Sequence, residues 1–322
     1  MPSISDLIER PRCPVCGAAP GRTLYHAAFD EPPLRDYLFR TYPGLREPDL
    51  ELLSDAEYVL DECSACTLVW QRFAPTERLL ALLYETWAAD DGGLARQDNL
   101  DYHRSIAEEV LLVVELAGRR PSEVAVLDFG MGWGRWARMA AAFGCRAYGV
   151  EPAEPQAGYA RSQGVTVLTL DELPDATFDF VNCEQVFEHL VDPRATITRL
   201  ARSLAPQGWM KINVPEGRGI AERLRSPDWS AGRRTSGSLV AVAPLEHLNC
   251  FNKRALDALA AQGGLGEARP EMAAVYAATI GLWPPRRFAR GLVRPPLRRV
   301  APRAAPRRAT TTPGARFYRP VR

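Results

Sequence analysis

Short apolar segments alternate with longer stretches of helical apolar spacing along the chain from Glu123 onward. The apolar segments, four to six residues each, occupy positions 124–128, 147–150, 165–168, 178–183 and 209–214. Strands that alternate with helices at this period predict an α/β fold with a doubly wound, mostly parallel sheet and helices on both faces. Ligands of such sheets bind at the carboxyl ends of the strands, so the residues that follow each strand are the candidates for chemistry.

The chain before Glu123 has a different pattern. Helical apolar spacing marks residues 76–84, with Thr76 placed to cap them, and residues 101–118. An Asp-Asp-Gly-Gly run at 90–93 interrupts the two helical segments. We therefore predict a small module with a linker helix over residues 1–90 and a larger α/β domain over residues 91–283.

Four of the seven cysteines form two Cys-x-x-Cys pairs, Cys13 with Cys16 and Cys63 with Cys66. Two such turns together offer the four thiolates that structural zinc prefers, and they leave no coordination position open for catalysis. The pairs are separated by 46 residues, more than the roughly 15–20 of a minimal zinc ribbon. The intervening segment must then fold as an element of its own, so we predict a zinc-ribbon-like module with structural Zn²⁺; a redox pair is the alternative. We expect the other three cysteines to be small buried side chains: Cys145, Cys183 and Cys250.

A glycine-rich turn follows the first predicted strand. Gly130, Gly132 and Gly134 allow a tight turn that lets a ligand approach the backbone before a helix begins near Arg135. A phosphate-binding P-loop would need Gly-Lys-Ser/Thr here, but the first lysine of the chain is Lys211. A dinucleotide fingerprint would need its third glycine where Arg135 stands. Both kinds of phosphate site are thereby disfavoured.

Two acidic residues favour a cationic ligand that has no phosphate. Asp128 lies two residues before the first glycine, where it would repel a phosphate but would suit the sulfonium and the α-ammonium of S-adenosylmethionine. Glu151 lies 23 residues beyond Asp128, at the end of the second strand, and can bind both hydroxyls of a ribose. Together they indicate an S-adenosylmethionine site, although each acid taken alone could be a loop cap or a solvated strand end.

Four ordered motifs between about 123 and 265 resemble those of the class I S-adenosylmethionine-dependent methyltransferases. They are LDFGMGWG at 127–134, GVEP at 149–152, TFDFVNCEQVFEHLVDP at 177–193 and LAPQGWM at 204–210. The resemblance implies a Rossmann-like methyltransferase sheet and the cofactor S-adenosyl-L-methionine. It also implies a set of donor-binding residues at the strand ends: Asp128, Gly130, Met131, Gly132, Trp133, Gly134, Glu151 and Pro152, with Thr169 and Leu170 beside the adenine and Cys183 and Glu184 at the methionine end.

The histidines are the candidates for proton transfer, which is needed only where the acceptor must lose a proton. His26 and His103 lie in the cysteine module and in the helix over 101–118, where we expect structural or solvated roles. His189 follows the fourth strand, and His247 follows a 29-residue insertion after the fifth. We hypothesise that His247 is the general base, that Glu246 orients or assists it, and that His189 is the second candidate; a packing role for His247 is the alternative.

The cysteine module and the Glu-His-Leu-Asn-Cys-Phe segment at 246–251 partially resemble the sugar C-methyltransferases. That resemblance implies that the acid and the histidine accept a proton. We therefore predict methyl transfer to a small-molecule acceptor, such as a sugar, a glycan or a secondary metabolite. The alternative is an RNA methyltransferase that holds nucleic acid with its zinc module and a basic tail, and a non-catalytic binding module is the third interpretation.

Charge is distributed unevenly over the 322 residues, although the formal net charge is only +1. Up to Glu271 the chain has 28 basic and 39 acidic residues, a net −11, and beyond it 12 basic residues and no acidic one. The acidic body argues against RNA. The segment 284–322 is rich in Pro and Arg, so we predict a disordered basic tail or a contact arm for anionic surfaces.

Composition agrees with a globular protein, with 46% hydrophobic and 25% charged residues. No apolar run reaches the roughly 18–20 residues that a bilayer crossing needs. The N-terminal residues also lack the apolar core of a signal peptide. We therefore expect no transmembrane segment and a cytoplasmic location.

Overall fold

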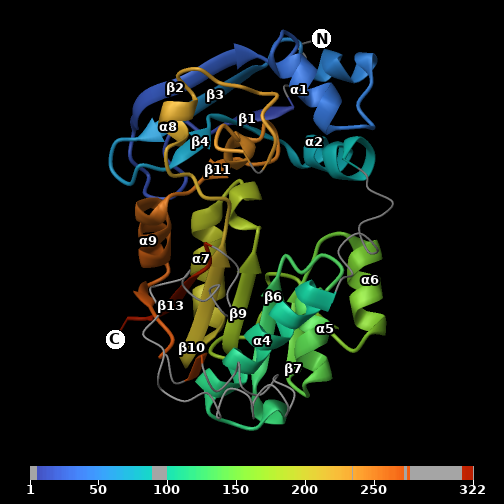
Figure 1. Ribbon diagram of the computed structural model, residues 1–322, viewed down its shortest axis with the longest axis vertical. Coiled ribbons are helices and arrows are strands. Elements are labelled where there is room, and N and C mark those ends of the chain that lie inside the picture. Colours follow the sequence, from blue (N-terminus) through green and yellow to red (C-terminus); the bar gives the residue numbers. More distant parts are fainter. Residues whose placement is uncertain (1–5, 89–99, 234, 272–273, 276–313, 322) are drawn as a thin grey trace, which may run out of the picture. The chain divides into compact units, whose positions relative to one another are not determined.

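The computed structural model describes residues 6–88, 100–233, 235–271, 274–275 and 314–321, in two compact units (Figure 1). The first unit comprises Met1–Gly93, Gln185–Arg199 and Val214–Gly264. The second comprises Leu94–Glu184, Leu200–Asn213 and Leu265–Arg322. Each unit is therefore assembled from three separate stretches of the chain. Within the residues described, no helix combines the length and the apolar character needed to cross a membrane.

The second unit is built on a seven-stranded sheet with the order β12-β13-β10-β9-β6-β7-β8. Its strands are β6 (Ala125–Phe129), β7 (Arg146–Val150), β8 (Thr166–Val167), β9 (Phe178–Glu184), β10 (Leu204–Asn213), β12 (Leu265–Ala268) and β13 (Arg316–Pro320). The strands from β10 to β8 are parallel, as the alternation of apolar and helical segments predicted. The α/β fold class with a mostly parallel sheet is thus confirmed.

The far end of the chain supplies a strand inside this sheet. β13 lies between β10 and β12 and runs antiparallel to both. Phe317 and Tyr318 of β13 are buried, and the Phe317 ring contacts Trp209. The prediction of a disordered tail over 284–322 is therefore wrong for these five residues, because two strand edges and two aromatic side chains outweigh the composition of the segment. The Pro- and Arg-rich residues 284–313 lie outside the described part of the chain.

Helices α4 (Leu100–Ala117) and α5 (Arg135–Ala142) pack on one face of the sheet (Figure 1). Their apolar sides form a core with Val126 of β6 and Phe180 of β9. Trp136 of α5 stacks on Phe180 within this core, with ring centroids 5.7 Å apart. A smaller core joins α6 (Glu154–Ser162) to the loop after β6. The packing fixes where the residues after β6 can lie.

The first unit contains two small sheets and several short helices. Its strands are β1 (Leu7–Glu9) paired with β5 (Phe73–Pro75), and β2 (Pro20–Ala28), β3 (Glu57–Cys63), β4 (Val69–Gln71) and β11 (Asn249–Cys250) in the order β11-β4-β3-β2. Its helices are α1 (Leu34–Thr41), α2 (Glu77–Leu82), α8 (Ile220–Arg223) and α9 (Lys253–Gln262). Helix α7 (Pro193–Ser203) runs across the boundary between the units. Thr76 caps α2 by accepting a hydrogen bond from the Leu79 amide, as predicted.

One hydrophobic core joins the cysteine module to the insertion after β10. Tyr58 of β3, Leu38 of α1, Trp229, Val242 and Leu245 belong to it. The rings of three tyrosines surround the Trp229 indole at 5.4–5.7 Å between centroids: Tyr25, Tyr37 and Tyr58. The N-terminal module therefore does not close at residue 90, since the insertion completes its core. Periodicity along the chain carries no information about this long-range packing.

Three buried polar side chains tie the segments of the first unit together. Gln71 donates to the carbonyls of Ala243 (2.9 Å) and His247 (3.1 Å) and accepts from the Leu245 amide (3.3 Å). The Arg10 guanidinium donates to the carbonyls of Gln71 and Leu248 and to the Asn249 side chain. The Asn249 amide in turn donates to the carbonyls of Phe187 (3.0 Å) and Leu190 (2.7 Å). These bonds hold residues 187–190 and 243–249 in place.

Candidate active site and metal centre

The glycine loop lies between β6 and α5. Gly130, Gly132 and Gly134 all have positive φ, a conformation that side-chain-bearing residues rarely adopt. A Cβ atom on Gly134 would also lie 3.0 Å from the Cβ of Ala160 in α6. The turn is thus tight for two reasons, backbone conformation and close packing. The amides of Gly130 and Met131 donate to the Val150 carbonyl, and that of Gly134 donates to the Met131 carbonyl, so the loop is fixed against the end of β7.

Asp128 is buried near the carboxyl end of β6, where it holds the start of α5. One carboxylate oxygen accepts a hydrogen bond from the Ala137 amide (3.2 Å) and the other from the Asn182 side chain (2.8 Å). Only 3% of the residue is exposed. Burial raises the pKa of Asp128 to about 7, although both hydrogen bonds act in the opposite direction. A cation beside it would favour its charged form.

Glu151 follows β7 and holds the glycine loop from the other side. Its carboxylate accepts hydrogen bonds from the amides of Gly132 (2.8 Å) and Ala153 (3.0 Å). The side chain is therefore fixed in direction rather than free at a strand end. Asp128 and Glu151 bracket one loop at the carboxyl ends of two adjacent parallel strands.

A buried lysine that the sequence reasoning passed over lies beside these acids. Lys211 of β10 is opposite Asn182 of β9, which is opposite Asp128 of β6, so the three side chains form one row on the same face. The Lys211 ammonium lies 2.5 Å from Glu109 of α4 and 2.9 Å from Glu184. A lysine between Met210 and Ile212, inside an apolar strand, was the signal that could have revealed it.

The charge states of Lys211 and the carboxyl groups around it depend on one another. Burial lowers the pKa of Lys211, but the carboxylates of Glu109 and Glu184 outweigh burial and raise it above its ordinary value. Burial likewise raises the pKa of Glu109 against the effect of the ammonium. The buried Asp128 and Glu109 and the part-exposed Glu184 thus surround one buried ammonium, an excess of acids that suits a ligand with positive charge.

The other predicted donor residues lie at the same edge of the sheet. Met131 packs against Gly149, where a Cβ would be 2.1 Å from its sulfur, and Trp133 contacts the ring of Tyr159. Thr169 donates from its amide and hydroxyl to Glu172 after β8, and Glu184 accepts from Asn213 (2.6 Å). Pro152 and Leu170 directly follow Glu151 and Thr169. Cys183 is fully buried at the end of β9, in agreement with its expected burial.

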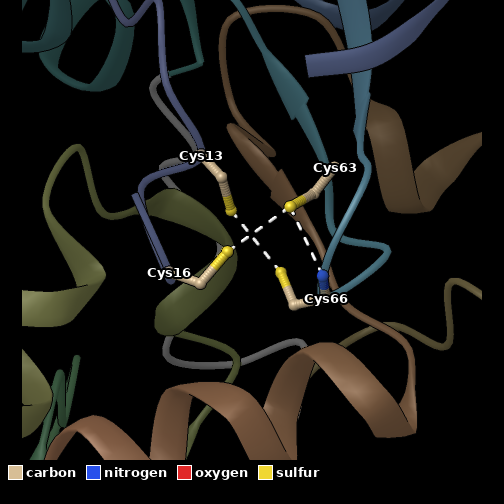
Figure 2. A group of neighbouring side chains, drawn as sticks. All are labelled: Cys13, Cys16, Cys63 and Cys66. Atoms are coloured by element: carbon tan, nitrogen blue, oxygen red, sulfur yellow. Dashed lines mark hydrogen bonds between the residues drawn. The ribbon is translucent and has the colours of Figure 1, made fainter. Parts of the chain in front are cut away.

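The four cysteines of the two Cys-x-x-Cys pairs meet in the first unit (Figure 2). The short contacts run across the pairs, with 3.5 Å between the sulfurs of Cys13 and Cys66 and 3.4 Å between those of Cys16 and Cys63. β2 and β3 bring them together, because these antiparallel strands are formed by the long intervening segment. Zinc bonded to sulfur at about 2.3 Å would separate the sulfurs by roughly 3.8 Å.

This geometry fits a shared ion better than two redox pairs, since the short sulfur–sulfur contacts join cysteines of different motifs. The amides of Ala65 and Cys66 both lie 3.4 Å from the Cys63 sulfur, so they can donate to a thiolate there. The four residues are thus compatible with a structural zinc site.

A second cluster in the first unit contains Glu188, His189 and His247, whose potential ligand atoms lie within 4.8 Å of one another. The two imidazoles meet edge to face with 4.8 Å between centroids. Nδ1 of His189 lies 3.0 Å from the Glu246 carbonyl and 3.1 Å from the Tyr84 hydroxyl. Burial lowers the pKa of His189 to about 4 and that of His247 to about 3, so both rings are neutral near pH 7.

The cluster brings the predicted catalytic residues together but gives Glu246 a different contact. Nδ1 of His247 is bonded to the carbonyl of Val240, which therefore orients the ring. The Glu246 carboxylate lies 3.4 Å from the Tyr42 hydroxyl, and its backbone carbonyl faces His189. Leu245, just before it, has φ +68°, a strained conformation for a branched residue. Glu188, which belongs to the motif at 177–193, joins the two histidines in this cluster, a contact that the spacing along the chain did not predict.

The remaining histidines have ordinary surroundings. His26 forms an ion pair with Glu57 at 2.8 Å, and both side chains are exposed. His103 lies on α4, with the ring of Tyr102 beside it. Neither approaches the clusters described above as a ligand.

Comparison with known proteins places the chain among methyl-transferring enzymes. A model of the methyltransferase domain matches residues 100–266. The ubiquinone biosynthesis O-methyltransferase of Idiomarina loihiensis is 33% identical over 94 residues, 26% of this chain and 39% of that protein. That of Rhizobium leguminosarum is 36% identical over 100 residues, 28% of this chain and 40% of that protein. The chain thus spans about two fifths of the length of these curated relatives.

The solved structures that resemble this chain have lower sequence identity to it than the curated relatives do. A SAM-dependent methyltransferase from Aquifex aeolicus is 17% identical, with a TM-score of 0.40 over 56% of this chain and 91% of that one. A possible histamine N-methyltransferase from Thermotoga maritima is 23% identical, with a TM-score of 0.36 over 51% and 73%. The domain model, in contrast, covers more than half of the chain and includes the sheet, the glycine loop and both acids. The chain therefore belongs to the methyltransferase domain family.

Proposed function

We propose that this chain methylates a hydroxyl oxygen of a small-molecule acceptor, with a sugar, a glycan or a secondary metabolite as the candidate classes. The observation that carries the proposal is the pair of acids, Asp128 and Glu151, that brackets the glycine loop at adjacent strand ends. The names of the curated relatives, which are O-methyltransferases, support oxygen as the accepting atom.

S-adenosylmethionine supplies, when bound, a methyl group on a sulfonium that is already activated for displacement. Glu151 would bind the ribose hydroxyls with the lone pairs that its two amide bonds leave available. Asp128 and Glu184 would face the cationic end, where Lys211 offsets part of their charge. Thr169 and Leu170, after β8, would flank the adenine.

We further propose that the four cysteines bind structural zinc. Their four sulfurs fill a tetrahedral shell and leave no position for a substrate. The zinc would hold the turn before β2 to the turn after β3, and thereby the unit that carries the histidines.

The histidine cluster supplies the proton acceptor of the proposed reaction. Because its Nδ1 faces the Val240 carbonyl, the His247 ring carries its proton on that nitrogen and leaves Nε2 free to accept another. The acceptor oxygen would form a bond to the methyl carbon while the carbon–sulfur bond breaks and its electron pair stays on sulfur. The proton of the acceptor hydroxyl would pass to Nε2 of His247, with His189 as the second candidate.

Calorimetry with S-adenosylmethionine and with its demethylated product tests the donor site. Asp128→Asn and Glu151→Gln should each weaken binding by about tenfold or more, because each carboxylate makes two bonds that its amide would make only in part. Glu154→Gln is the matched control, since Glu154 is an exposed residue of α6 paired only with Arg161 in a surface ion pair. Full affinity in both acid variants would refute the donor site.

Methyl transfer to panels of sugars, glycans and phenolic metabolites tests the acceptor class. His247→Ala should lower the turnover number at saturating donor, whereas His26→Ala should not, because His26 is exposed and pairs with Glu57. Undiminished turnover in His247→Ala would remove the base assignment. Methylation of RNA with salt-sensitive retention, and of no small molecule, would replace the proposed acceptor class.

A further inference from the structure

We infer that Glu188, His189 and His247 form a binding site for a divalent transition-metal cation, made of residues other than the four cysteines. The inference rests on the proposed donor site and hydroxyl acceptor, and it replaces His247 as the direct proton acceptor, since Nε2 of His247 would be a ligand of the cation. Two imidazoles and one carboxylate are a recurrent ligand set for Zn²⁺, Fe²⁺ and related ions that keep open positions. All three potential ligand atoms lie within 4.8 Å of one another.

The contacts of the two imidazoles leave Nε2 of each ring available as a metal ligand. A carbonyl oxygen can only accept, so the bonds to Glu246 and Val240 place a proton on Nδ1 of His189 and of His247. Each ring then presents an unprotonated Nε2. Histidines that bind metals commonly donate their other N–H group to a backbone carbonyl, which fixes the direction of the ring. Both histidines of this cluster have that arrangement.

Glu188 adds the negative charge that a cation site requires. Its side chain is 1% exposed, and one carboxylate oxygen lies 3.8 Å from Nε2 of His189. Ligands at about 2.1 Å from a metal lie roughly 3 Å apart, so side-chain rotations of an ångström or two would complete the shell. One carboxylate and two neutral imidazoles would leave a bound divalent ion with a net positive charge and open coordination positions.

The framework around the cluster limits its motion to such rotations. Asn249 holds the carbonyls on either side of Glu188 and His189, those of Phe187 and Leu190. Gln71 holds the backbone of Leu245 and His247, where the positive φ of Leu245 turns the Glu246 carbonyl toward His189. The ligands come from two segments of the chain but are fixed by one buried network.

Ligand chemistry separates this site from the cysteine cluster. Thiolates select Zn²⁺, whereas nitrogen and oxygen ligands also accept Mn²⁺, Fe²⁺ and Co²⁺. A bound cation would coordinate the oxygen of an acceptor hydroxyl and promote loss of its proton to water, in place of direct transfer to His247. The acceptors that fit best are therefore those with two neighbouring oxygen donors, such as vicinal diols.

Mn²⁺ titration of the zinc-loaded full-length protein, followed by electron paramagnetic resonance of free Mn²⁺, tests the site. We expect one bound Mn²⁺ per chain in the unaltered protein. Glu188→Gln and His247→Asn should weaken that binding by at least about tenfold, since each loses a direct ligand. His26→Ala is the matched control and should bind as the unaltered protein does. Circular dichroism and zinc content establish that each variant is folded.

Mn²⁺ binding and S-adenosylmethionine binding test the cation site and the proposed function separately. If no Mn²⁺ binds, or if Glu188→Gln and His247→Asn bind it with unchanged affinity, the cation site is refuted. Calorimetry with S-adenosylmethionine in the absence of Mn²⁺ is the second measurement. Donor binding without Mn²⁺ binding would remove the cation site alone, whereas loss of donor binding in the unaltered protein would remove the proposed function instead.

Discussion

Asp128 in the second unit and His189 in the first are held in place in different ways. The Asp128 carboxylate accepts a hydrogen bond from Ala137, nine residues away on the same strand-loop-helix segment. The His189 ring bonds to the carbonyl of Glu246, 57 residues away, and the backbone of His247 is held by Gln71, 176 residues away. Asp128 is thus held on one side by its own strand-loop-helix motif and on the other by Asn182, 54 residues away. The histidine cluster has no local motif and is built from segments that meet only in the folded chain.

The difference indicates which contacts the geometry of each site depends on. A local motif carries its own geometry, because the strand, the glycine turn and the helix that follow one another place the acid directly. The histidine cluster has no such motif, so its geometry depends on β4 and on the insertion after β10. Four predictions test this contrast, in order of decreasing expected effect.

The largest effect is expected from removal of the cysteine cluster. Cys63→Ser should lose bound zinc and with it much of the ~10 kcal/mol or more that structural zinc contributes to folding. Zinc analysis and thermal unfolding measure the loss. Cys145→Ala is the control, because Cys145 is a buried cysteine of the second unit. Full zinc content and an unchanged melting temperature in Cys63→Ser would show that the cysteines hold no structural ion.

Lys211→Met tests the buried charges of the second unit. Without the ammonium, the buried Glu109 loses its ion-pair partner and the part-exposed Glu184 loses a second charge contact, so the free energy of unfolding should fall by about 3–5 kcal/mol. Urea unfolding measures the change. The chain has one other lysine, Lys253, which pairs with Asp257 on the exposed side of α9. Lys253→Met should therefore cost less than about 1 kcal/mol, and an equal cost for both lysines would contradict the interpretation.

Gln71→Leu tests the framework of the histidine cluster. The variant leaves the Ala243 and His247 carbonyls and the Leu245 amide without their bonds to Gln71, so unfolding should become easier by roughly 3 kcal/mol. It should also weaken Mn²⁺ binding and leave S-adenosylmethionine binding unchanged. Gln163→Leu at the end of α6 is the comparison, since its side chain bonds only to Ser162 on the surface. A loss of donor binding in Gln71→Leu would break the proposed separation of the two sites.

The pH dependence of stability should reveal the buried Asp128. Burial raises its pKa from 3.8 to about 7, so between these values the folded state keeps a proton that the unfolded state has lost. Its contribution to stability is complete below the unfolded value and falls as the pH rises through 7, by about 2 kcal/mol from about pH 5 to about pH 7. Urea unfolding across this range should show a flatter profile in Asp128→Asn than in Glu154→Gln. Parallel profiles would contradict the raised pKa.

Much of the second unit could be predicted from the sequence, and the exceptions have physical reasons. The strands β6, β7 and β9 have apolar residues on both faces, although Asp128 and Asn182 interrupt them, so their short apolar runs could be recognised in the sequence. The strand β13 was not predicted, because the Arg- and Pro-rich composition around it is typical of disordered chains. It forms a strand because it pairs with the edges of β10 and β12. Lys211 was missed because no local pattern shows that Glu109, on a helix 102 residues earlier, faces it.

The sequence by itself determined the class of fold, the glycine loop and the two acids beside it, because these depend on residues close to one another along the chain. It also identified the four cysteines, since ligand pairs carry their own spacing. Only the tertiary structure decided that the insertion after β10 completes the first unit, that Val240 rather than Glu246 orients His247, and that Glu188 joins the histidines. These contacts arise from packing between distant segments, which no local spacing records.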